Sequence, residues 1–366
     1  MAKTLKSDQT LFLATLLLVG VSIVMVYSAS AVVAMERFQQ PYLFLTKQTL
    51  LAALGLALLW CVMGVDYRIY REPVFLWTCL GVALLCLIAV LFSAPVNNAR
   101  RWFSIGGLGI QPSELAKLAA IFFIAALLER RMHRINELGY ALLPIGLVVG
   151  LLVGLILLEP DFGTSMSLAL IAGVMVFAAG LNYRYIFGAA LALLPMVAFL
   201  AMGADYRRRR ILTFLNPWED PLGDGFQIIQ SLIAVGTGGI WGRGLMHGVQ
   251  KLFYLPEPHT DFIFAVISEE LGLIGATLVL LCFCVITWRG IRVALRAPDT
   301  FGAFLALGLT TMVAAQAFVN ISVVLGLAPT KGIPLPFVSS GGSSLLVNLV
   351  GMGVLLNVSQ HASTEA

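Results

Sequence analysis

The feature that most constrains this chain is a series of long apolar runs that carry few or no charges. Each run has about 18 to 25 residues, the length that an α-helix needs to cross a hydrocarbon core roughly 30 Å thick. With 59% hydrophobic and 11% charged residues, the chain has too little charge to cover a water-soluble globule. The sequence therefore predicts an all-α integral membrane protein with about ten spans, in one polytopic domain over residues 1–366. The expected spans lie at residues 11–35, 43–64, 73–92, 113–128, 140–158, 163–181, 185–203, 262–288, 301–325 and 343–358.

The distribution of lysine and arginine predicts how the helices are oriented. With ten spans both termini lie on one side, and the segments on that side carry eleven lysine and arginine residues against four in the short opposite loops. The positive-inside rule places the termini in the cytoplasm. Residues 204–261, between the seventh and eighth spans, then form one long extracytoplasmic loop, because long loops translocate largely regardless of their charge. The basic residues of this loop favour an anionic ligand.

The long loop has internal organisation. Residues 226–235 have helical periodicity and several large apolar side chains, so we expect an interfacial helix there. Residues 236–244 are rich in glycine, which permits sharp turns and close approach of the backbone to a ligand. An ordinary glycine-rich connection fits that run equally well.

Cysteine and histidine exclude two kinds of site. All five cysteines lie inside apolar runs, which is typical of small packing residues and not of a disulfide framework. The four histidines are scattered, and none has a partner at the spacing of metal ligands. We therefore expect no metal site built by the chain alone, and we expect no nucleic-acid partner.

Ionisable residues inside the spans are expensive unless they are paired. Glu114 and Lys117 are three residues apart on one helical face, so they should pair with each other, with Asp161 as a third member. This cluster could hold helices together or serve a function. Glu269 and Glu270 point about 100° apart on a helix, so at most one should face a given polar cavity. Helix packing and a proton or cation site are both open for them.

Two outer segments combine charge with unusual backbone chemistry. Asp261 ends the long loop directly before the eighth span, at the level of lipid headgroups. Its carboxylate could act as a general base on a lipid-linked substrate, although the position alone favours a helix N-cap. Lys331 lies among the glycines, serines and prolines of residues 329–344, which can form an anion cradle or simply stiffen the start of the tenth span.

Five sets of motifs carry a resemblance to a known family. They are 98–103 (NARRWF) with 111–117 (QPSELAK), 159–165 (EPDFGTS), 220–231 (DPLGDGFQIIQS), 255–264 (LPEPHTDFIF) with 269–272 (EELG), and 334–344 (PLPFVSSGGSS). In this order, over nearly the whole chain, they make the protein similar to the shape, elongation, division and sporulation family of bacterial cell-wall glycosyltransferases. Residues 329–332 (PTKG) and 248–252 (GVQKL) look more like a division member than an elongation member.

The resemblance implies a peptidoglycan polymerase in the bacterial cytoplasmic (inner) membrane. Such an enzyme joins lipid II molecules, which are disaccharide-pentapeptides on undecaprenyl pyrophosphate, at the outer membrane face. Asp261 matches the family's essential aspartate and would act on the acceptor hydroxyl. Candidates for substrate binding are Arg101, Lys331, Arg207, Arg210, Gln230, His259 and Ser339, with the cations assigned to phosphates. Glu114, Lys117, Asp161, Glu269 and Glu270 form the candidate polar cluster within the membrane.

The resemblance also implies partners. A single-span class B penicillin-binding protein, which is a transpeptidase, and other divisome or elongasome membrane proteins are expected. A divalent cation, Mg²⁺ or Mn²⁺, fits a pyrophosphate substrate, although no dedicated metal cage is visible. Two alternatives remain: a lipid II flippase, since charges within the membrane also mark transport routes, and a non-catalytic scaffold for the transpeptidase.

Overall fold

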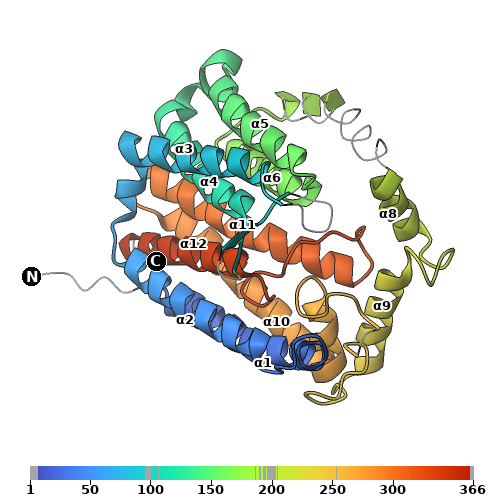
Figure 1. Cartoon of the computed structure of the whole chain (residues 1–366). Helices are drawn as coiled ribbons and strands as arrows, with labels where there is room; N and C mark the ends of the chain where they lie inside the picture. The colour runs from blue at the N-terminus through green and yellow to red at the C-terminus, as the bar shows by residue number, and fades with distance from the viewer. Residues whose placement is uncertain are drawn as a thin grey trace, which may run out of the picture.

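The computed structural model describes residues 7–94, 100–105, 108–185, 187, 188, 191, 192, 195, 203, 205–252 and 254–362, without the side chains of 104, 105, 108 and 205–207. Nearly all of its regular structure is helical (Figure 1). The long helices are α1 Gln9–Phe38, α2 Leu43–Met63, α3 Pro73–Val90, α4 Pro112–Arg131, α5 Leu143–Leu158, α6 Phe162–Ala178, α8 Asp205–Leu215, α9 Phe226–Gly238, α10 Ile263–Arg296, α11 Thr300–Val324 and α12 Gly342–His361. Short helical turns lie at Tyr67–Arg71, Met132–Arg134 and Leu138–Leu142.

The helices agree with the predicted spans as far as the described residues reach. Within that part of the chain, seven helical segments are long and apolar enough to cross a membrane. Helices α4 and α6 also coincide with predicted spans, but α4 carries charges at both ends and α6 has only 17 residues. Most of the span expected at 185–203 lies outside the described residues. The protein is a multi-pass membrane protein, and the count of ten spans stays a prediction.

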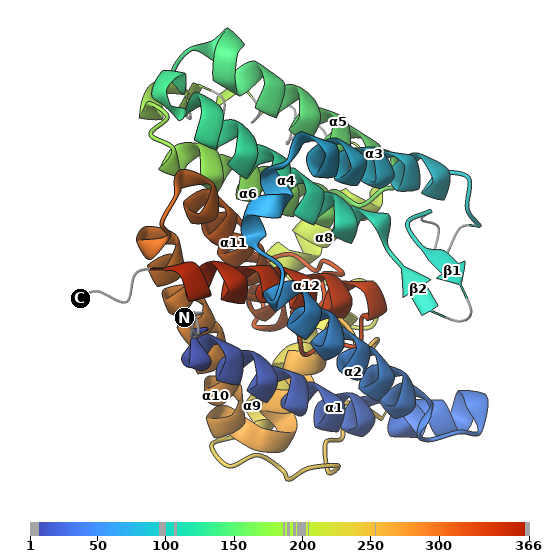
Figure 2. The same cartoon turned by 90° about the vertical axis from the view of Figure 1, so that its left-hand side faces the viewer.

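Helices α12 and α11 form the centre of the bundle. In α12, 83% of the apolar stretch is buried, against 28% in α2 and in α3. Helix α12 packs against α2, and α10 packs against α11, α1 and α9 (Figure 2). The outer helices keep apolar side chains exposed because lipid covers them in a membrane.

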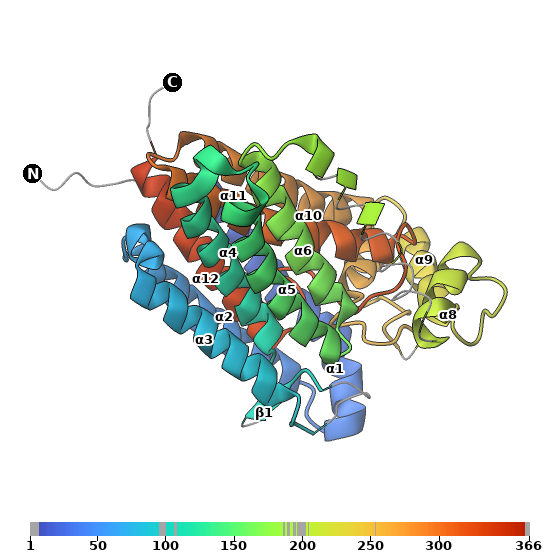
Figure 3. The same cartoon turned by 90° about the horizontal axis from the view of Figure 1, so that it is seen from above.

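The start of α1 and the end of α12 lie on the same side of the bundle (Figure 3). The backbone N–H of Asp8 donates to Ser359 Oγ at 3.0 Å, and Arg289 Nη2 lies 2.6 Å from Asp8 Oδ2. Asp8 also caps α1 by accepting from the N–H of Leu11. This arrangement agrees with termini on the same side, and the assignment of that side to the cytoplasm stays a prediction.

Helix α10 is interrupted at Gly272, where φ is 65° and ψ is −164°. The segment that follows α9 fills the break with its backbone. The N–H groups of Arg243 and Gly244 donate to the carbonyls of Glu269 and Glu270 at 3.0 and 2.9 Å, and the N–H of Leu273 donates to Gly239 at 2.9 Å. These contacts satisfy backbone groups that a broken helix would leave bare within the membrane. The glycine-rich run is therefore part of the α10 helix break.

Gly242 is the most demanding position of this break. Its φ is 80°, and a Cβ there would overlap the carbonyl oxygen of Glu270. We expect Gly242→Ala to lower the free energy of unfolding by more than about 1–2 kcal/mol, because a left-handed alanine adds its own cost to the overlap. Gly236→Ala is the matched control, since Gly236 lies in α9 with open space around its Cα. Thermal unfolding in detergent should show a lower midpoint for Gly242→Ala alone; equal midpoints would contradict the assignment.

One short two-stranded hairpin accompanies the predicted all-α fold in the described part of the chain. Strand β1 (Phe103–Ile105) pairs antiparallel with β2 (Leu108–Ile110), with Phe103 opposite Ile110. Strands of three residues are too short to show an alternating apolar pattern, so periodicity did not predict them. The hairpin leads directly into α4, and the N–H of Gln111 donates to Ser343 Oγ at the start of α12.

The long loop contains two helices where one was expected. The predicted helix at 226–235 is confirmed as α9, and its interfacial position stays a prediction. Helix α8, which carries the arginine run, was not predicted because its sequence DYRRRRILTFL lacks a strong apolar stripe.

Candidate functional site

Asp261 is held by the last loop between α11 and α12, residues 328–341, which we call the 328–341 loop. Ser339 Oγ donates to the carbonyl of Thr260 at 2.6 Å, and the N–H of Ser340 donates to the carbonyl of His259 at 2.9 Å. A Cβ placed on Gly332 would lie 3.0 Å from Asp261 Oδ2. The carboxylate therefore lies directly against the residue that follows Lys331. The predicted site residues Ser339, His259 and Asp261 do come together.

Asp261 does not cap α10. The N-cap position of this helix is Phe262, with no side-chain capping bond. Thr260 Oγ1 bonds instead to Glu257, at 3.3 Å from the carbonyl oxygen. The N-cap interpretation favoured by spacing is therefore wrong, because α10 begins at Ile263 and its N-cap residue is Phe262, one residue after Asp261. The carboxylate is left for other contacts.

Two amides on α11 hold the inner side of the 328–341 loop. Asn320 Nδ2 donates to the carbonyls of Asp261 and Ile333, both at 2.8 Å. Gln316, one turn earlier, donates to the carbonyl of Pro334 at 3.1 Å. Neither residue was a predicted site residue. A polar amide pair four residues apart inside an apolar span was the signal that could have found them.

Arg101 and Arg210 act electrostatically on Asp261, and Lys331 belongs to the loop that packs against it. Arg101 precedes the hairpin, Arg210 lies on α8, and Lys331 lies in the 328–341 loop. Arg210 Nη1 donates to the carbonyl of Thr330 at 3.3 Å, which places α8 beside this loop. Lys331 Nζ lies 5.0 Å from the ring centre of Phe162. Three of the predicted phosphate ligands thus belong to one region.

The electrostatics of this region shift two titratable groups. Burial raises the pKa of Asp261 to about 6, the negative charge of Glu257 acts in the same direction, and Arg101 and Arg210 oppose the rise. Burial lowers the pKa of Lys331, and the charge of Asp161 opposes that effect. A carboxyl group with a pKa near 6 is ionised at neutral pH and still basic enough to accept a proton.

Glu159 is a buried acid that sequence reasoning did not single out. Its side chain has no exposed surface, and within the described residues neither carboxyl oxygen has a hydrogen-bond partner. Burial raises its pKa to about 8; the charge of Asp161 adds to this, and Arg101 opposes it. Glu159 is therefore mostly protonated at neutral pH. The sequence signal that could have identified Glu159 is its position directly after an apolar run.

Other predicted residues lie at the margin of the site. The ring of His259 lies 4.7 Å from that of Phe44, centre to centre, and burial lowers the pKa of its imidazole. Gln230 is half-buried on α9, and no hydrogen bond among the described residues joins it to the Asp261 segment. The side chain of Arg207 lies outside the described part of the chain, although its backbone belongs to α8.

The predicted ion pair within the membrane is present, but its third member differs. Lys117 Nζ lies 2.8 Å from Glu114 Oε1, and both side chains are buried. Lys117 continues to Gln316 Oε1 at 3.3 Å, so the pair connects to α11. Asp161 instead accepts from Gln111 Nε2 at 2.9 Å and from the N–H of Thr164, which it caps at the start of α6. Its carboxylate is oriented by these neutral donors.

Glu269 and Glu270 face the same segment, contrary to the helical-angle prediction. Glu269 accepts from the N–H of Val249 at 2.8 Å, while Glu270 accepts from the N–H of Met246 at 3.1 Å. The helical angle alone was misleading because the 245–251 segment wraps around this end of α10. Both carboxylates are fully buried.

These two glutamates also form ion pairs with two basic residues of the long loop. Lys251 Nζ lies 2.6 Å from Glu270 Oε1, and Arg243 Nη1 lies 3.7 Å from Glu269 Oε1. The pattern that favoured an anionic ligand counted both cations. Lys251 contributes no free charge to such a ligand, because its ammonium group is buried in this pair.

The residues around Asp261 do not form a metal cage. Among the described residues, no group of three histidine, cysteine, aspartate or glutamate side chains is placed to hold a metal ion. Glu257 is the carboxylate whose charge acts on Asp261, and Arg101 and Arg210 are the cations that oppose it. A divalent cation would have to take most of its ligands from phosphate and water. We derive no step through such an ion.

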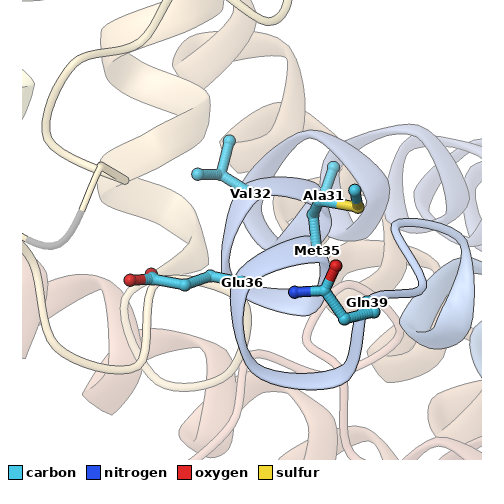
Figure 4. A pocket seen from close by; sticks show the side chains of 5 residues that line it. All are labelled: Ala31, Val32, Met35, Glu36 and Gln39. Atoms are coloured by element: carbon cyan, nitrogen blue, oxygen red, sulfur yellow. The ribbon is translucent and has the colours of Figure 1, made fainter.

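A separate hollow lies at the end of α1. Figure 4 shows its lining, which consists of Ala31, Val32, Met35, Glu36 and the C-cap residue Gln39. It contains one carboxylate and none of the cations around Asp261. Its chemistry does not suit an anionic ligand.

Comparisons with known proteins show the family of the chain. A family model described as a cell cycle protein matches residues 8–364. A probable peptidoglycan glycosyltransferase FtsW of Geobacter metallireducens is 46% identical over 355 residues, covering 96% of this chain and 94% of that protein. Stage V sporulation protein E of Bacillus subtilis is 45% identical over 366 residues, covering 98% and 99%.

Solved structures have the same fold. A chain of a peptidoglycan synthase complex that coordinates polymerization and crosslinking superposes with a TM-score of 0.79 at 32% identity, covering 99% of this chain and all of that one. The rod shape determining protein RodA of Thermus thermophilus gives a TM-score of 0.72 at 28% identity, with 99% of each chain covered. The family match over nearly the whole chain and these full-length similarities show that the protein belongs to the shape, elongation, division and sporulation family of cell cycle proteins.

Proposed function

We propose that this protein is a peptidoglycan glycosyltransferase that polymerises lipid II at the outer face of the bacterial cytoplasmic membrane. The observation that carries the proposal is the Asp261 carboxylate, which caps no helix at the start of α10, with Arg101 and Arg210 acting on its charge and Lys331 in the loop packed against it. A base surrounded by cations suits a reaction in which a hydroxyl loses a proton and a pyrophosphate leaves.

The proposed reaction gives each group one task. Asp261 accepts the proton of the acceptor sugar hydroxyl as its oxygen attacks the anomeric carbon of the donor sugar. The bond between that carbon and the pyrophosphate breaks, and undecaprenyl pyrophosphate leaves. The guanidinium groups of Arg101 and Arg210 and the ammonium group of Lys331 stabilise the charge that develops on the phosphates.

The names of the relatives support this activity and leave the cellular role open between division and sporulation. The proteins called FtsW and stage V sporulation protein E are 46% and 45% identical to this chain, while RodA is 28% identical. We therefore propose a role in septal or spore wall synthesis over a role in elongation. A class B penicillin-binding protein is the proposed partner, because a structural neighbour belongs to a complex that combines polymerization with crosslinking.

The test is reconstitution. The purified chain and its transpeptidase partner are placed in vesicles with fluorescent lipid II, and the products are separated on a gel and digested with a muramidase. We expect muramidase-sensitive strands that persist when penicillin blocks the transpeptidase. Lipid II that crosses the bilayer without any strand formation would identify a flippase and overturn the proposal. Strands that form equally well with the partner alone would identify a scaffold.

A further inference from the structure

Asn320 lies at a junction that the proposed chemistry does not yet explain. Its side chain is 2% exposed, on the buried side of α11 near the C-terminal end of the helix. Its amide nitrogen donates to the carbonyls of Asp261 and Ile333, both at 2.8 Å. Since a carbonyl can only accept, both bonds require the NH₂ group at this position. One side chain therefore joins two segments that are far apart in the sequence.

The two joined segments carry the opposite charges of the site. Asp261 supplies the carboxylate, and Ile333 is two residues from Lys331. Between them, Gly332 lies against Asp261 Oδ2 closely enough that a Cβ would be 3.0 Å away. A shift of the 328–341 loop relative to the end of α10 would change this contact and the distance between base and cation together.

The unpaired half of the amide supports a positioning role. Asn320 Oδ1 is buried and has no hydrogen-bond partner among the described residues. A buried acceptor without a hydrogen bond costs free energy. The two hydrogen bonds that the NH₂ group donates must therefore determine the orientation of the side chain. Asn320 therefore tolerates an unsatisfied oxygen while it holds the two carbonyls.

Gln316, one turn earlier on α11, makes a second contact with the 328–341 loop. It donates to the carbonyl of Pro334 and accepts from Lys117, which is paired with Glu114. The 328–341 loop is thus bound at two successive carbonyls, Ile333 and Pro334, by one face of α11. This second contact anchors the loop and leaves Asn320 as the residue that also reaches Asp261.

We propose that Asn320 is a positioning residue that sets the placement of the Asp261 carboxylate relative to the Lys331 segment. The proposal rests on the proposed function, in which Asp261 is the base. It predicts an effect on the chemical step and on the titration of the base, whereas a residue that only stabilised the fold would affect neither in the folded protein.

The experiment compares Asn320→Leu with Asn357→Leu. Asn357 is a matched asparagine on α12, 3% exposed, which also bridges two segments by accepting from the N–H of Tyr67 and donating to the carbonyl of Met63. It lies near the chain termini and away from Asp261. Both variants lose comparable buried hydrogen bonds, so both should lower the thermal unfolding midpoint.

Only Asn320→Leu should change the reaction. In reconstituted complexes we expect kcat for strand formation to fall about 100-fold with little change in KM, because a small misplacement of a catalytic group is costly. The acid limb of the pH profile should move down from about 6 toward the ordinary carboxyl value of about 4, since a loosened loop admits water to Asp261. Asn357→Leu should keep both values.

The outcomes separate the inference from the function on which it rests. If wild type makes no strands, the proposed function fails. If wild type is active and Asn320→Leu retains its kcat and its pH midpoint, the positioning role is wrong and Asn320 is only structural. If Asn320→Leu does not fold, kcat and the pH midpoint are measured for Asn320→Ser instead, which keeps one hydrogen-bond donor. Unchanged values in that variant would likewise show that the positioning role is wrong.

Discussion

Replacement of Asp261 by asparagine is expected to lower the rate of strand formation by about 10²- to 10⁴-fold, the usual contribution of a general base. The amide has nearly the same size but cannot accept the proton of the acceptor hydroxyl. The 328–341 loop should remain in place, because its bonds to this segment use the backbone of residues 259–261. The measurement is the initial rate of polymerisation by the reconstituted complex, with lipid II held at saturation.

The pKa shift of Asp261 determines the direction in which the rate and the stability should change with pH. The unfolded carboxyl has a pKa near 3.8, and burial raises the pKa of Asp261 to about 6 in the folded protein. The base is active only when ionised, so the wild-type rate should fall as pH drops through about 6. Because the folded protein holds this proton more tightly, ionisation of Asp261 costs stability at neutral pH. The unfolding midpoint of Asp261→Asn at pH 7 should therefore equal or exceed that of wild type.

Glu257→Gln is the control for this experiment. Glu257 is exposed, and its charge raises the pKa of Asp261. The control should stay active, with the acid limb moved to a lower pH. If Asp261→Asn keeps the wild-type rate, or if its rate still falls through pH 6, then Asp261 is not the base.

Replacement of Lys251 by methionine is expected to lower the free energy of unfolding by about 3–5 kcal/mol, because it leaves Glu270 as an uncompensated buried charge. The ammonium group lies 2.6 Å from Glu270 Oε1 and donates to Ser28 Oγ at 2.9 Å. This cluster ties α1, α10 and the 245–251 segment together. Thermal or denaturant unfolding in detergent, followed by loss of the monodisperse peak in size-exclusion chromatography, measures the change.

Two variants test the cause of that loss. Adding Glu270→Gln to Lys251→Met removes the stranded charge and should restore part of the stability. Arg243→Gln should cost less than about 1 kcal/mol, because Arg243 is 39% exposed and sits 3.7 Å from its carboxylate. Glu269 also keeps its bonds from the N–H groups of Val249 and Gln250. An equal loss in Lys251→Met and Arg243→Gln would show that burial of the pair does not decide stability.

The polar residues could be predicted from the sequence more easily than their partners. Glu114 and Lys117 were paired correctly because three residues on a helix fix their separation. Asp161 was assigned to the same pair and instead binds Gln111 and Thr164. No local rule predicts which of several helices lies next to a given side chain.

The break in α10 is a second feature that local sequence rules did not predict, here within one helix. Gly272 lies inside the span predicted at 262–288, two residues after Glu270, and the hydropathy of the span gives no signal for a break there. The break is stable because the 238–244 backbone supplies the missing hydrogen bonds, and Gly242 permits the close approach. Sequence reasoning left the glycine run undecided between a ligand loop and a connection, and its actual contact is with α10.

By itself the sequence determined the solvent, the positions of the long apolar helices in the described part of the chain, and the family, because transfer free energy and ordered motifs depend only on residues close together in the chain. The tertiary structure decided whether Asp261 caps a helix or stays open to a substrate, and which cations surround it. That outcome depends on Asn320, Gly332 and Ser339, which lie 59 to 78 residues further along the chain. Contacts at such separations arise only when the helices pack.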